Sequence, residues 1–235
     1  MLKNNILISG TNSGLGKFLS KKLGGHRLKR KKNFSFYKKK NWDLIIHCGF
    51  YTGNDLKKFL ENIRLSYLIS KLESRKTIFI STMLVHDKKN NSLYKQSKEI
   101  CETFFCGKKD YVIRLGSLIG EEMRKNTIYK ILFTKSPKIG LTQNSKYSFI
   151  HYNEVLQLII LLIKQDKKKH VNFYRHRLFS IDQIANKFNK KVKYGNFFFK
   201  CTTLKSYPKT YFNNIIKNKT SLDVLKEFKN FRRSK

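Results

Sequence analysis

Three short stretches of this sequence hold residue types that could do chemistry together. The first, SGTNSGLG at residues 9–16, places Gly10, Gly14 and Gly16 between an apolar run and an amphipathic segment. Glycine at a strand end permits a tight turn, and glycine at a helix start lets the backbone approach a pyrophosphate, which the partial positive charge of the helix N-terminus also attracts. Alone the loop is ambiguous, because many glycine loops only turn the chain.

The second stretch places Tyr94 and Lys98 four residues apart on one helical face. A tyrosine hydroxyl has a pKa of about 10, and a neighbouring ammonium stabilises the phenolate and lowers that pKa, so the pair could exchange a proton at neutral pH. The third stretch, Ser81-Thr82, ends an apolar run where a hydroxyl could bond a substrate oxygen. Each also fits an ordinary surface helix or strand end, and only their order along the chain favours a joint function.

An alternation of strand and helix patterns surrounds these stretches. Apolar runs predict strands at 5–9, 43–48, 77–81 and 111–115, and helical spacing predicts helices from the glycine loop to Gly24-Gly25, at 56–72 and at 94–105. Continuously apolar strands separated by helices imply a parallel sheet covered on both faces. We therefore predict an α/β fold with a Rossmann-type, doubly wound parallel sheet.

Beyond about residue 120 the alternation loosens into a smaller C-terminal cap. Helical patterns remain at 126–133, 152–164, 181–188 and 221–228, with a strand candidate at 171–174. We expect the cap to complete a substrate cleft, with Phe197-Phe198-Phe199 in its core and the terminal FKNFRRSK as a frayed basic tail. The stretch 26–42 is too short for a full strand, helix and strand, so a crossover helix there is missing or reduced to a loop.

Lysine and arginine number 51 against 15 acidic residues, giving a net charge of +36. Such a charge first suggests nucleic acid or an anionic membrane. The lysines are scattered, however, and the single alanine with a surplus of Lys, Asn, Ile and Phe indicates AT-rich codon bias. We interpret the lysines mainly as a solvated surface and do not expect a nucleic-acid partner. The shortage of acidic residues keeps a polyanion or membrane open as an alternative, and steep salt dependence on generic DNA would identify a nucleic-acid-binding protein.

Cysteines and histidines point to no metal. The four cysteines lack metal-type spacing, and His47 and His151 read as hydrogen-bonded structural residues. No signal-peptide pattern and no apolar run of about 20 residues occurs, so we expect no transmembrane segment and a reducing, cytoplasmic setting.

Seven segments in the right order resemble the extended branch of the short-chain dehydrogenase/reductase superfamily, the NAD(P)-dependent sugar epimerases, dehydratases and reductases. They are SGTNSGLG, DLIIHCG (43–49), the helical Asn62, IFISTMLVH (78–86), YKQSKEICE (94–102), YVIRLGSLIG (111–120) and FIHYNEV (149–155). Among them, YKQSKEICE matches the family's YxxSKxxxE pattern. The resemblance covers most of the chain and implies a shortened member of that branch.

The resemblance implies a catalytic set of Thr82, Tyr94 and Lys98. In it Tyr94 exchanges a proton with the substrate oxygen, Lys98 lowers the pKa of Tyr94 and bonds the nicotinamide ribose, and Thr82 orients the substrate. The implied cofactor-binding residues are Gly10, Asn12, Ser13, Gly14, Leu15, Gly16, Arg30, Lys31, Cys48, Gly49, Tyr94 and Lys98. The implied organisation is an NAD(P)-binding domain over 1–120, a substrate-binding cap over 121–235 interleaved with the sheet, and a possible homodimer through the helices at 55–72 and 94–106.

Departures from the family pattern narrow the reaction and the cofactor. The second strand should end near 28–31, where Arg30 and Lys31 and no acidic residue occur, which favours NADP over NAD. Met83-Leu84 replace the Asp-Glu pair of 4,6-dehydratases, which leaves a reductase or an epimerase. The expected substrate is a sugar, in particular a nucleotide sugar. The short segment between Thr82 and Tyr94 supports an alternative, a catalytically inactive dinucleotide-binding sensor or scaffold.

Overall fold

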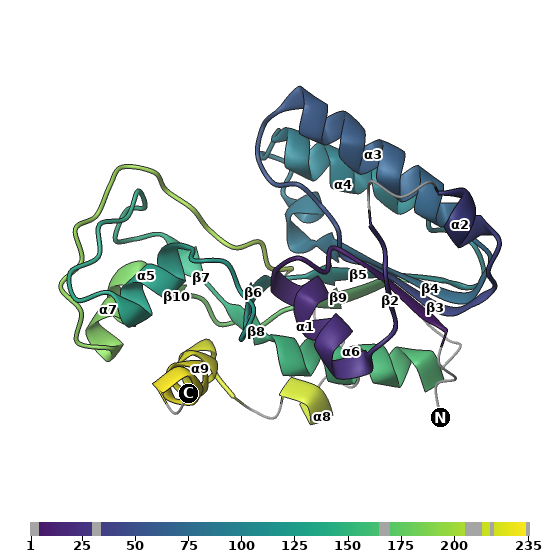
Figure 1. Cartoon of the computed structure of the whole chain (residues 1–235). Coiled ribbons are helices and arrows are strands. Elements are labelled where there is room, and N and C mark those ends of the chain that lie inside the picture. Colours follow the sequence, from purple (N-terminus) through teal and green to yellow (C-terminus); the bar gives the residue numbers. More distant parts are fainter. Residues whose placement is uncertain (1–4, 30–33, 165–169, 205–212, 217–218, 234–235) are drawn as a thin grey trace. The chain divides into compact units, whose positions relative to one another are not determined.

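The computed structural model describes residues 5–29, 34–164, 170–204, 213–216 and 219–233 (Figure 1). The chain forms two compact units, one of residues 1–115 and 159–172 and the other of residues 116–158 and 173–235. All four cysteines are free thiols. Among the described helices, none is both long and apolar enough to cross a bilayer.

A six-stranded sheet with the order β2-β1-β3-β4-β5-β9 forms the centre of the first unit. Its strands are β1 (Ile6–Ser9), β2 (His26–Arg27), β3 (Trp42–His47), β4 (Ser74–Thr82), β5 (Asp110–Leu115) and β9 (His170–Phe173). The neighbouring pairs from β2 to β5 are parallel. The chain runs outward from β1 to β2 and then returns to β3 on the other side of β1, so the sheet is doubly wound, as predicted.

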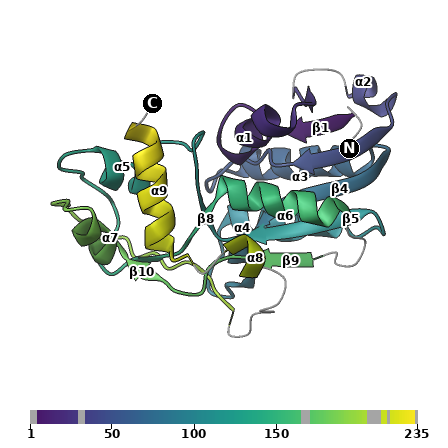
Figure 2. The same cartoon turned by 90° about the horizontal axis from the view of Figure 1, so that it is seen from below.

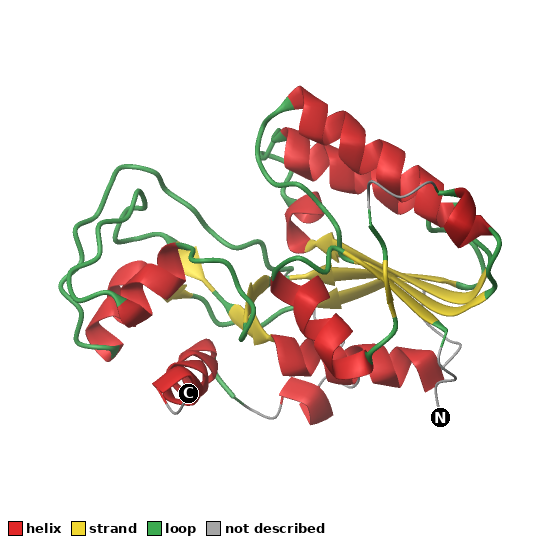
Figure 3. Ribbon diagram, in the orientation of Figure 1, coloured by secondary structure: helices red, strands yellow, loops and turns green. Residues whose placement is uncertain are grey.

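Helices cover both faces of this sheet, which Figures 2 and 3 show from two sides. They are α1 (Gly14–Leu23), α2 (Ser35–Lys38), α3 (Leu56–Ser70) and α4 (Leu93–Thr103), with the 3-10 helix η1 (Met83–His86). Helices α3 and α4 lie on one face and α1 on the other. The core beneath α3 and α4 joins strand residues such as Ile45 and Phe79 to Leu65, Ile69 and Cys101. The predicted strands and helices of residues 5–115 are confirmed to within a few residues.

The crossover between β2 and β3, which the sequence left open, is the single turn α2. Tyr37 in this turn is buried, and its hydroxyl accepts a hydrogen bond from the Lys29 N–H at 2.9 Å. The Trp42 indole N–H donates to the Tyr37 carbonyl at 3.1 Å. Two buried aromatic residues therefore fix a connection that is too short for a longer helix.

The second unit combines short strands with five helices in its described residues. They are β6 (Ser117–Ile119), α5 (Thr127–Phe133), β7 (Lys146–Tyr147), β8 (Phe149–His151), α6 (Tyr152–Lys164, which continues into the first unit), β10 (Phe179–Ser180), α7 (Ile181–Lys187), α8 (Asn213–Ile216) and α9 (Ser221–Arg233). β6 pairs with β8 in parallel and β10 with β7 antiparallel. The four helices predicted here are confirmed, whereas the strands of two or three residues gave no periodic signal.

Two predictions for the second unit are wrong. The C-terminal segment is not a frayed tail, because α9 continues to Arg233 and buries Val224, Leu225 and Phe228 at helical spacing. The triplet Phe197-Phe198-Phe199 is not in the core, since Phe197 and Phe198 are 66% and 54% exposed. Backbone hydrogen bonds to residues 140–146 hold this segment at the surface, and the ring of Phe199 packs on a neighbour.

Candidate active site

The glycine loop between β1 and α1 lies where the strand order reverses, the place at which doubly wound sheets bind dinucleotides. Gly10 and Gly14 have φ of +74° and +62°, in the left-handed region that favours glycine. A Cβ on Gly10 would lie 2.7 Å from the backbone nitrogen of Gly49, and one on Gly16 would lie 2.4 Å from the Gly10 carbonyl oxygen. The loop therefore packs as bare backbone against the turn that follows β3.

The first turn of α1 is open to a ligand at its start and closed beneath it. Asn12 is exposed, Ser13 and Gly14 are partly exposed, and Leu15 and Gly16 are buried. The Ser13 side chain makes no capping hydrogen bond, and the first turn contains no acidic residue. A helix start with these features suits an anion, because its first N–H groups and the helix dipole both favour negative charge.

A buried hydrogen-bond network ties the ends of β1 and β3 together. The Ser9 hydroxyl lies 2.6 Å from Nδ1 of His47 and accepts a hydrogen bond from the Gly49 N–H at 3.0 Å. On the other side of the ring, Nε2 of His47 lies 2.9 Å from the Ser66 hydroxyl on α3. His47 is fully buried, which confirms its predicted structural role. The network holds Gly49 beside the glycine loop.

Asn62 of α3 fixes the loop that follows Gly49. Its side chain is 2% exposed, accepts a hydrogen bond from the Tyr51 N–H at 2.8 Å and donates to the Tyr51 carbonyl at 3.0 Å. The helical asparagine that the family resemblance singled out therefore acts on the backbone of this loop. Phe50, which the sequence did not single out, is held in the same loop.

Lys98 connects α4 to β4 and to the loop that follows β3. Its ammonium donates a hydrogen bond to the Ile80 carbonyl of β4 at 2.6 Å. The ammonium lies 3.4 Å from the centroid of the Phe50 ring and 5.9 Å from the centroid of the Tyr94 ring. The Phe50 and Tyr94 rings meet edge to face, with 6.3 Å between their centroids. The predicted pair Tyr94 and Lys98 is thus brought to the loop after β3.

Burial dominates the pKa values at this place. It lowers the pKa of Lys98 to about 7, partly offset by Cys101, Cys48 and Glu102. It raises the pKa of Tyr94 to about 12, opposite to the direction that we predicted from the spacing of the two residues. The reason is that the Lys98 ammonium contacts Phe50 and a carbonyl oxygen, so the loss of hydration of the phenolate is not compensated.

The thiol of Cys48, next to the glycine contact, is likewise neutral. Desolvation raises its pKa to about 12, and the charge of Lys98 only partly opposes this rise. A thiol with such a pKa is a poor nucleophile at neutral pH. Cys48 can therefore line the site but is not itself a reactive group.

The structure separates the two hydroxyls at the end of β4. Ser81 is 4% exposed and donates a 2.6 Å hydrogen bond to Glu102, whose carboxylate also pairs with Arg114 at 2.6 Å. Thr82 is partly exposed, and its oxygen accepts a long hydrogen bond of 3.3 Å from the Leu84 N–H. Ser81 is consumed by an internal network, so Thr82 is the better candidate to bond a substrate.

The residues predicted to choose the cofactor, Arg30 and Lys31, lie outside the described residues. β2 ends at Arg27, whose Nε donates to the Ser20 hydroxyl of α1 at 3.1 Å. No acidic residue occurs in the sequence between the glycine loop and Asp43. The preference for NADP therefore stays a prediction.

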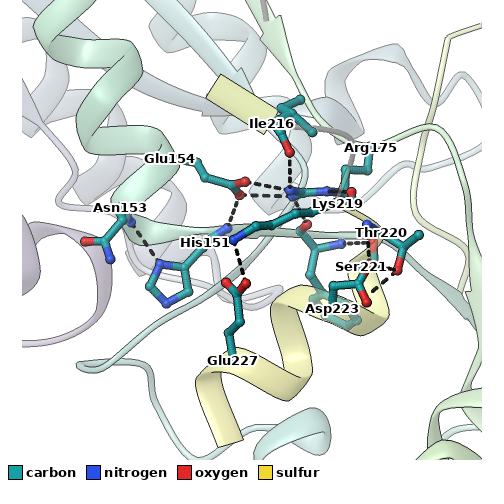
Figure 4. A network of polar contacts seen from close by, with 11 residues as sticks. His151, Asn153, Glu154, Arg175, Ile216, Lys219, Thr220, Ser221, Asp223 and Glu227 are labelled. Carbon is teal, nitrogen blue, oxygen red and sulfur yellow. Dashed lines mark hydrogen bonds and ion pairs between the residues drawn. The ribbon is translucent and has the colours of Figure 1, made fainter. Parts of the chain in front are cut away.

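A second polar cluster lies in the second unit (Figure 4). Arg175 pairs with Glu154 at 2.5 Å and donates to the Phe149 carbonyl at 2.6 Å, while Glu154 accepts from the His151 N–H at 2.8 Å. Burial lowers the pKa of His151, and its Nδ1 accepts from the Asn153 N–H. The cluster fixes the FIHYNEV segment and explains His151 as a structural residue. No group of three or more metal-binding side chains occurs in the described ranges.

Comparison with known proteins supports the fold. No protein-family model and no curated protein matches the chain. Similar solved structures include the NAD-dependent NDP-hexosamine 5,6-dehydratase TunA of tunicamycin biosynthesis, with a TM-score of 0.76, 13% identity and 99% coverage of both chains. UDP-N-acetylglucosamine 4-epimerase from Bacillus cereus has a TM-score of 0.74 and 14% identity, covering 97% of this chain and 99% of its own.

A third similar structure is dTDP-4-dehydrorhamnose reductase from Bacillus anthracis in complex with NADP, with a TM-score of 0.72 and 19% identity, covering 96% of this chain and 98% of its own. These are enzymes of the kind that the sequence resemblance named, and the likeness confirms the Rossmann-type fold. A dehydratase, an epimerase and a reductase share it, so the fold alone does not select the reaction.

Proposed function

We propose that this protein is an NAD(P)-dependent oxidoreductase or epimerase of the short-chain dehydrogenase/reductase superfamily, acting by hydride transfer on a sugar, in particular a nucleotide sugar. The observation that carries the proposal is the close backbone packing of Gly10 against Gly49 and of Gly16 against Gly10 at the reversal point of the sheet. Lys98 and Tyr94 contact Phe50, the residue that follows Gly49 in the loop after β3. The similar structures support the class, because all three are named for nucleotide sugars.

The described residues fit a dinucleotide. At Gly10 and Gly16 the loop packs on neighbouring backbone more closely than a Cβ allows, which sets the tight turn into α1. The start of α1 would attract the charge of a pyrophosphate. Gly49 and Cys48 would border the cofactor, and the Lys98 ammonium would bond its ribose. When bound, NADP or NAD would supply the hydride acceptor or donor. The lack of an acidic residue near the end of β2 favours NADP.

In the proposed mechanism, Tyr94 exchanges the proton. Its raised pKa keeps the phenol protonated in the free protein, ready to donate to a substrate carbonyl oxygen. Thr82 donates a hydrogen bond to the same oxygen and orients it. Lys98, once its charge is fixed by the bound ribose, stabilises the phenolate that proton transfer leaves behind. This arrangement favours reduction of a keto sugar as the step to test first.

Titration with NADPH and NADH, followed by nicotinamide fluorescence, tests cofactor binding. The variant Gly14→Asp places a negative charge at the start of α1 and should abolish binding. Gly24→Asp is the matched control, because Gly24 has a similar φ of +70° and open space around its Cβ position. If Gly14→Asp binds as tightly as the parent protein, the loop only turns the chain and the proposal fails.

A dinucleotide-binding sensor or scaffold without turnover is the second candidate, and one observation favours it. Lys98 is engaged by the Ile80 carbonyl and the Phe50 ring rather than by the Tyr94 hydroxyl. A strain that carries Tyr94→Phe separates the two functions. An unchanged biological role in that strain would favour the sensor, and its loss would favour the enzyme.

The proposal includes a homodimer through α3 and α4. Leu56, Leu60 and Tyr67 on α3 are 63%, 56% and 48% exposed, and Ile100 on α4 is 40% exposed. A second copy would cover this apolar face. Size-exclusion chromatography with light scattering should give a dimer that Leu60→Glu converts to a monomer, whereas Phe36→Glu, at a 45% exposed position on α2, should leave it intact.

A further inference from the structure

Two segments of the second unit, residues 134–147 and 188–201, run side by side, and we call them the Lys-Phe ribbon (Figure 1). Both are loops except for β7 at the end of the first. Isolated parallel bridges join Lys138 to Lys193, Leu141 to Phe197 and Lys146 to Lys200. Together the segments contain seven lysines and no aspartate or glutamate. The proposed active site uses none of these residues.

The backbone of the ribbon is fixed where its apolar side chains are exposed. The Phe197 N–H donates to the Gly140 carbonyl and the Phe197 carbonyl accepts from the Thr142 N–H, both at 3.0 Å. A Cβ on Gly195 would lie 2.6 Å from the Gly140 oxygen, so the two segments touch through bare backbone. The exposure of Phe197 therefore results from a defined backbone conformation. Its hydrogen bonds offset the entropy cost of ordering the backbone before any partner binds.

Phe199 anchors the same segment from the other end. Its N–H donates to the Ser145 hydroxyl at 3.1 Å, and its ring lies 4.8 Å from that of Tyr147 between centroids. The preceding ring, Phe198, is 54% exposed. Two consecutive phenyl rings are thus presented to solvent next to an anchored third.

The lysines of the ribbon stand in like-charged pairs. Lys138 faces Lys193 and Lys146 faces Lys200, and all four side chains are exposed. Like charges placed opposite each other on neighbouring strands are destabilising. No ion pair relieves these four lysines within the described part of the chain. A partner with negative charge would remove the repulsion, and an apolar layer beneath that charge would accept the rings.

We propose that the Lys-Phe ribbon docks the protein on an anionic lipid bilayer. Phe197 and Phe198 would insert at the boundary between headgroups and acyl chains, and the lysine ammoniums would contact the lipid phosphates and carboxylates. Every basic side chain in the ribbon is lysine. An ammonium is a point charge that suits diffuse attraction to a charged surface, whereas reading bases favours the arginine fork, so the bilayer fits better than a nucleic acid. This proposal does not depend on the enzyme activity.

Vesicle sedimentation with the full chain tests the proposal. The protein should bind phosphatidylcholine vesicles that contain about one-third phosphatidylglycerol and should not bind pure phosphatidylcholine. Changing Lys138, Lys146, Lys193 and Lys200 together to glutamine should reduce partitioning about 600-fold, because each lysine contributes about fivefold near an anionic surface. The double variant Phe197→Ser with Phe198→Ser should reduce it by about tenfold.

A charge-matched variant separates the ribbon from net charge. Lys88, Lys89, Lys108 and Lys109 are exposed lysines of the first unit, and changing all four to glutamine should alter partitioning by less than about threefold. An equal loss in this control would overturn the proposal, because net charge alone would then drive binding. Binding of a single-stranded oligonucleotide that needs the ribbon, without vesicle binding, would overturn it in favour of nucleic acid.

A tryptophan at the ribbon reports insertion directly. The chain has a single tryptophan, Trp42, which is 1% exposed and supplies a constant background. In Phe198→Trp, anionic vesicles should shift the emission to shorter wavelength, and brominated lipids should quench it. Binding without either change would mean that the ring stays in water, which contradicts the proposal.

Discussion

The glycine loop of the first unit and the Lys-Phe ribbon of the second are both shaped by a close contact between two glycines, but they suit different kinds of ligand. In the loop, Gly10 packs on Gly49, and in the ribbon, Gly195 packs on Gly140, each closer than a Cβ allows. The loop supplies N–H dipoles at a helix start, which suit one small anion. The ribbon supplies ammoniums and phenyl rings along extended chain, which suit a broad anionic and apolar surface. A close glycine contact sets the shape, and the side chains beside it choose the ligand.

The largest expected effect is on kcat, because we place the catalytic residues in the first unit alone. Tyr94→Phe should lower kcat for a nucleotide keto sugar by about 10²- to 10⁴-fold, because it removes the proton donor, while the Kd for NADPH stays the same. Steady-state rates and fluorescence titration measure the two quantities. Tyr67→Phe, at a 48% exposed position of α3, is the control. Full turnover by Tyr94→Phe would leave the enzyme proposal without its central residue.

Two glycine variants test whether this kind of close glycine contact serves two ligands. In Gly16→Ala the new Cβ would lie 2.4 Å from the Gly10 oxygen, so the loop must shift, and NADPH affinity should fall more than about tenfold with vesicle binding unchanged. In Gly195→Ala the Cβ would lie 2.6 Å from the Gly140 oxygen, and vesicle binding should fall instead. If both variants lose the same ligand, the two surfaces are not independent.

The pH dependence of NADPH binding should reveal the buried lysine. The pKa of Lys98 is lowered to about 7, so the free protein loses this proton above that pH, whereas a bound ribose favours the ammonium. Binding then takes up a proton, and Kd should rise by up to about tenfold per pH unit above 7. Lys98→Met should remove this dependence. A parent protein with a flat profile would mean that the ammonium does not contact the cofactor.

The same shift affects folding with a defined sign. From about pH 7 up to the unfolded value of about 10.4, the unfolded chain keeps the Lys98 proton that the folded chain has released. The contribution of this group to the free energy of unfolding therefore rises with pH across that window. Denaturant titrations of the parent protein and Lys98→Met would measure the difference. Ribbon variants, whose lysines are exposed, should not change that slope.

The sequence predicted the first unit better than the second, and particular residues show why. Strands such as β3 and β4 each contain a short apolar run, and the helices between the strands have regular spacing, so pattern alone indicated the sheet. The ion pair of Arg175 with Glu154 joins residues that only the fold brings together. The prediction that Phe197 lies in the core was wrong because hydrophobicity predicts burial, whereas backbone contacts hold this residue at the surface. The prediction of a lowered pKa for Tyr94 was wrong because residue spacing indicates proximity to Lys98 but not the desolvation of the phenol.

The smallest expected effects come from removing single side-chain hydrogen bonds near the glycine loop and near the ribbon. Ser66→Ala removes the 2.9 Å hydrogen bond between the Ser66 hydroxyl and Nε2 of the fully buried His47 and should cost about 1–3 kcal/mol of stability. Because His47 also holds Ser9, which bonds Gly49, the Kd for NADPH should rise a few-fold as well. The counterpart in the second unit is Tyr194→Phe, which removes a 3.1 Å hydrogen bond to Asp182 at a partly exposed site.

That second variant should cost less than about 1 kcal/mol and leave vesicle binding unchanged, since the backbone hydrogen bonds of Phe197 and the Ser145 contact of Phe199 hold the ribbon without Tyr194. Denaturant unfolding with both binding assays would measure each effect. Equal costs for the two variants would contradict the distinction between a loop supported by a buried side-chain network and a ribbon supported mainly by its own backbone hydrogen bonds. Unequal costs, with only the NADPH affinity moving, would place the His47 network among the residues that position the cofactor loop.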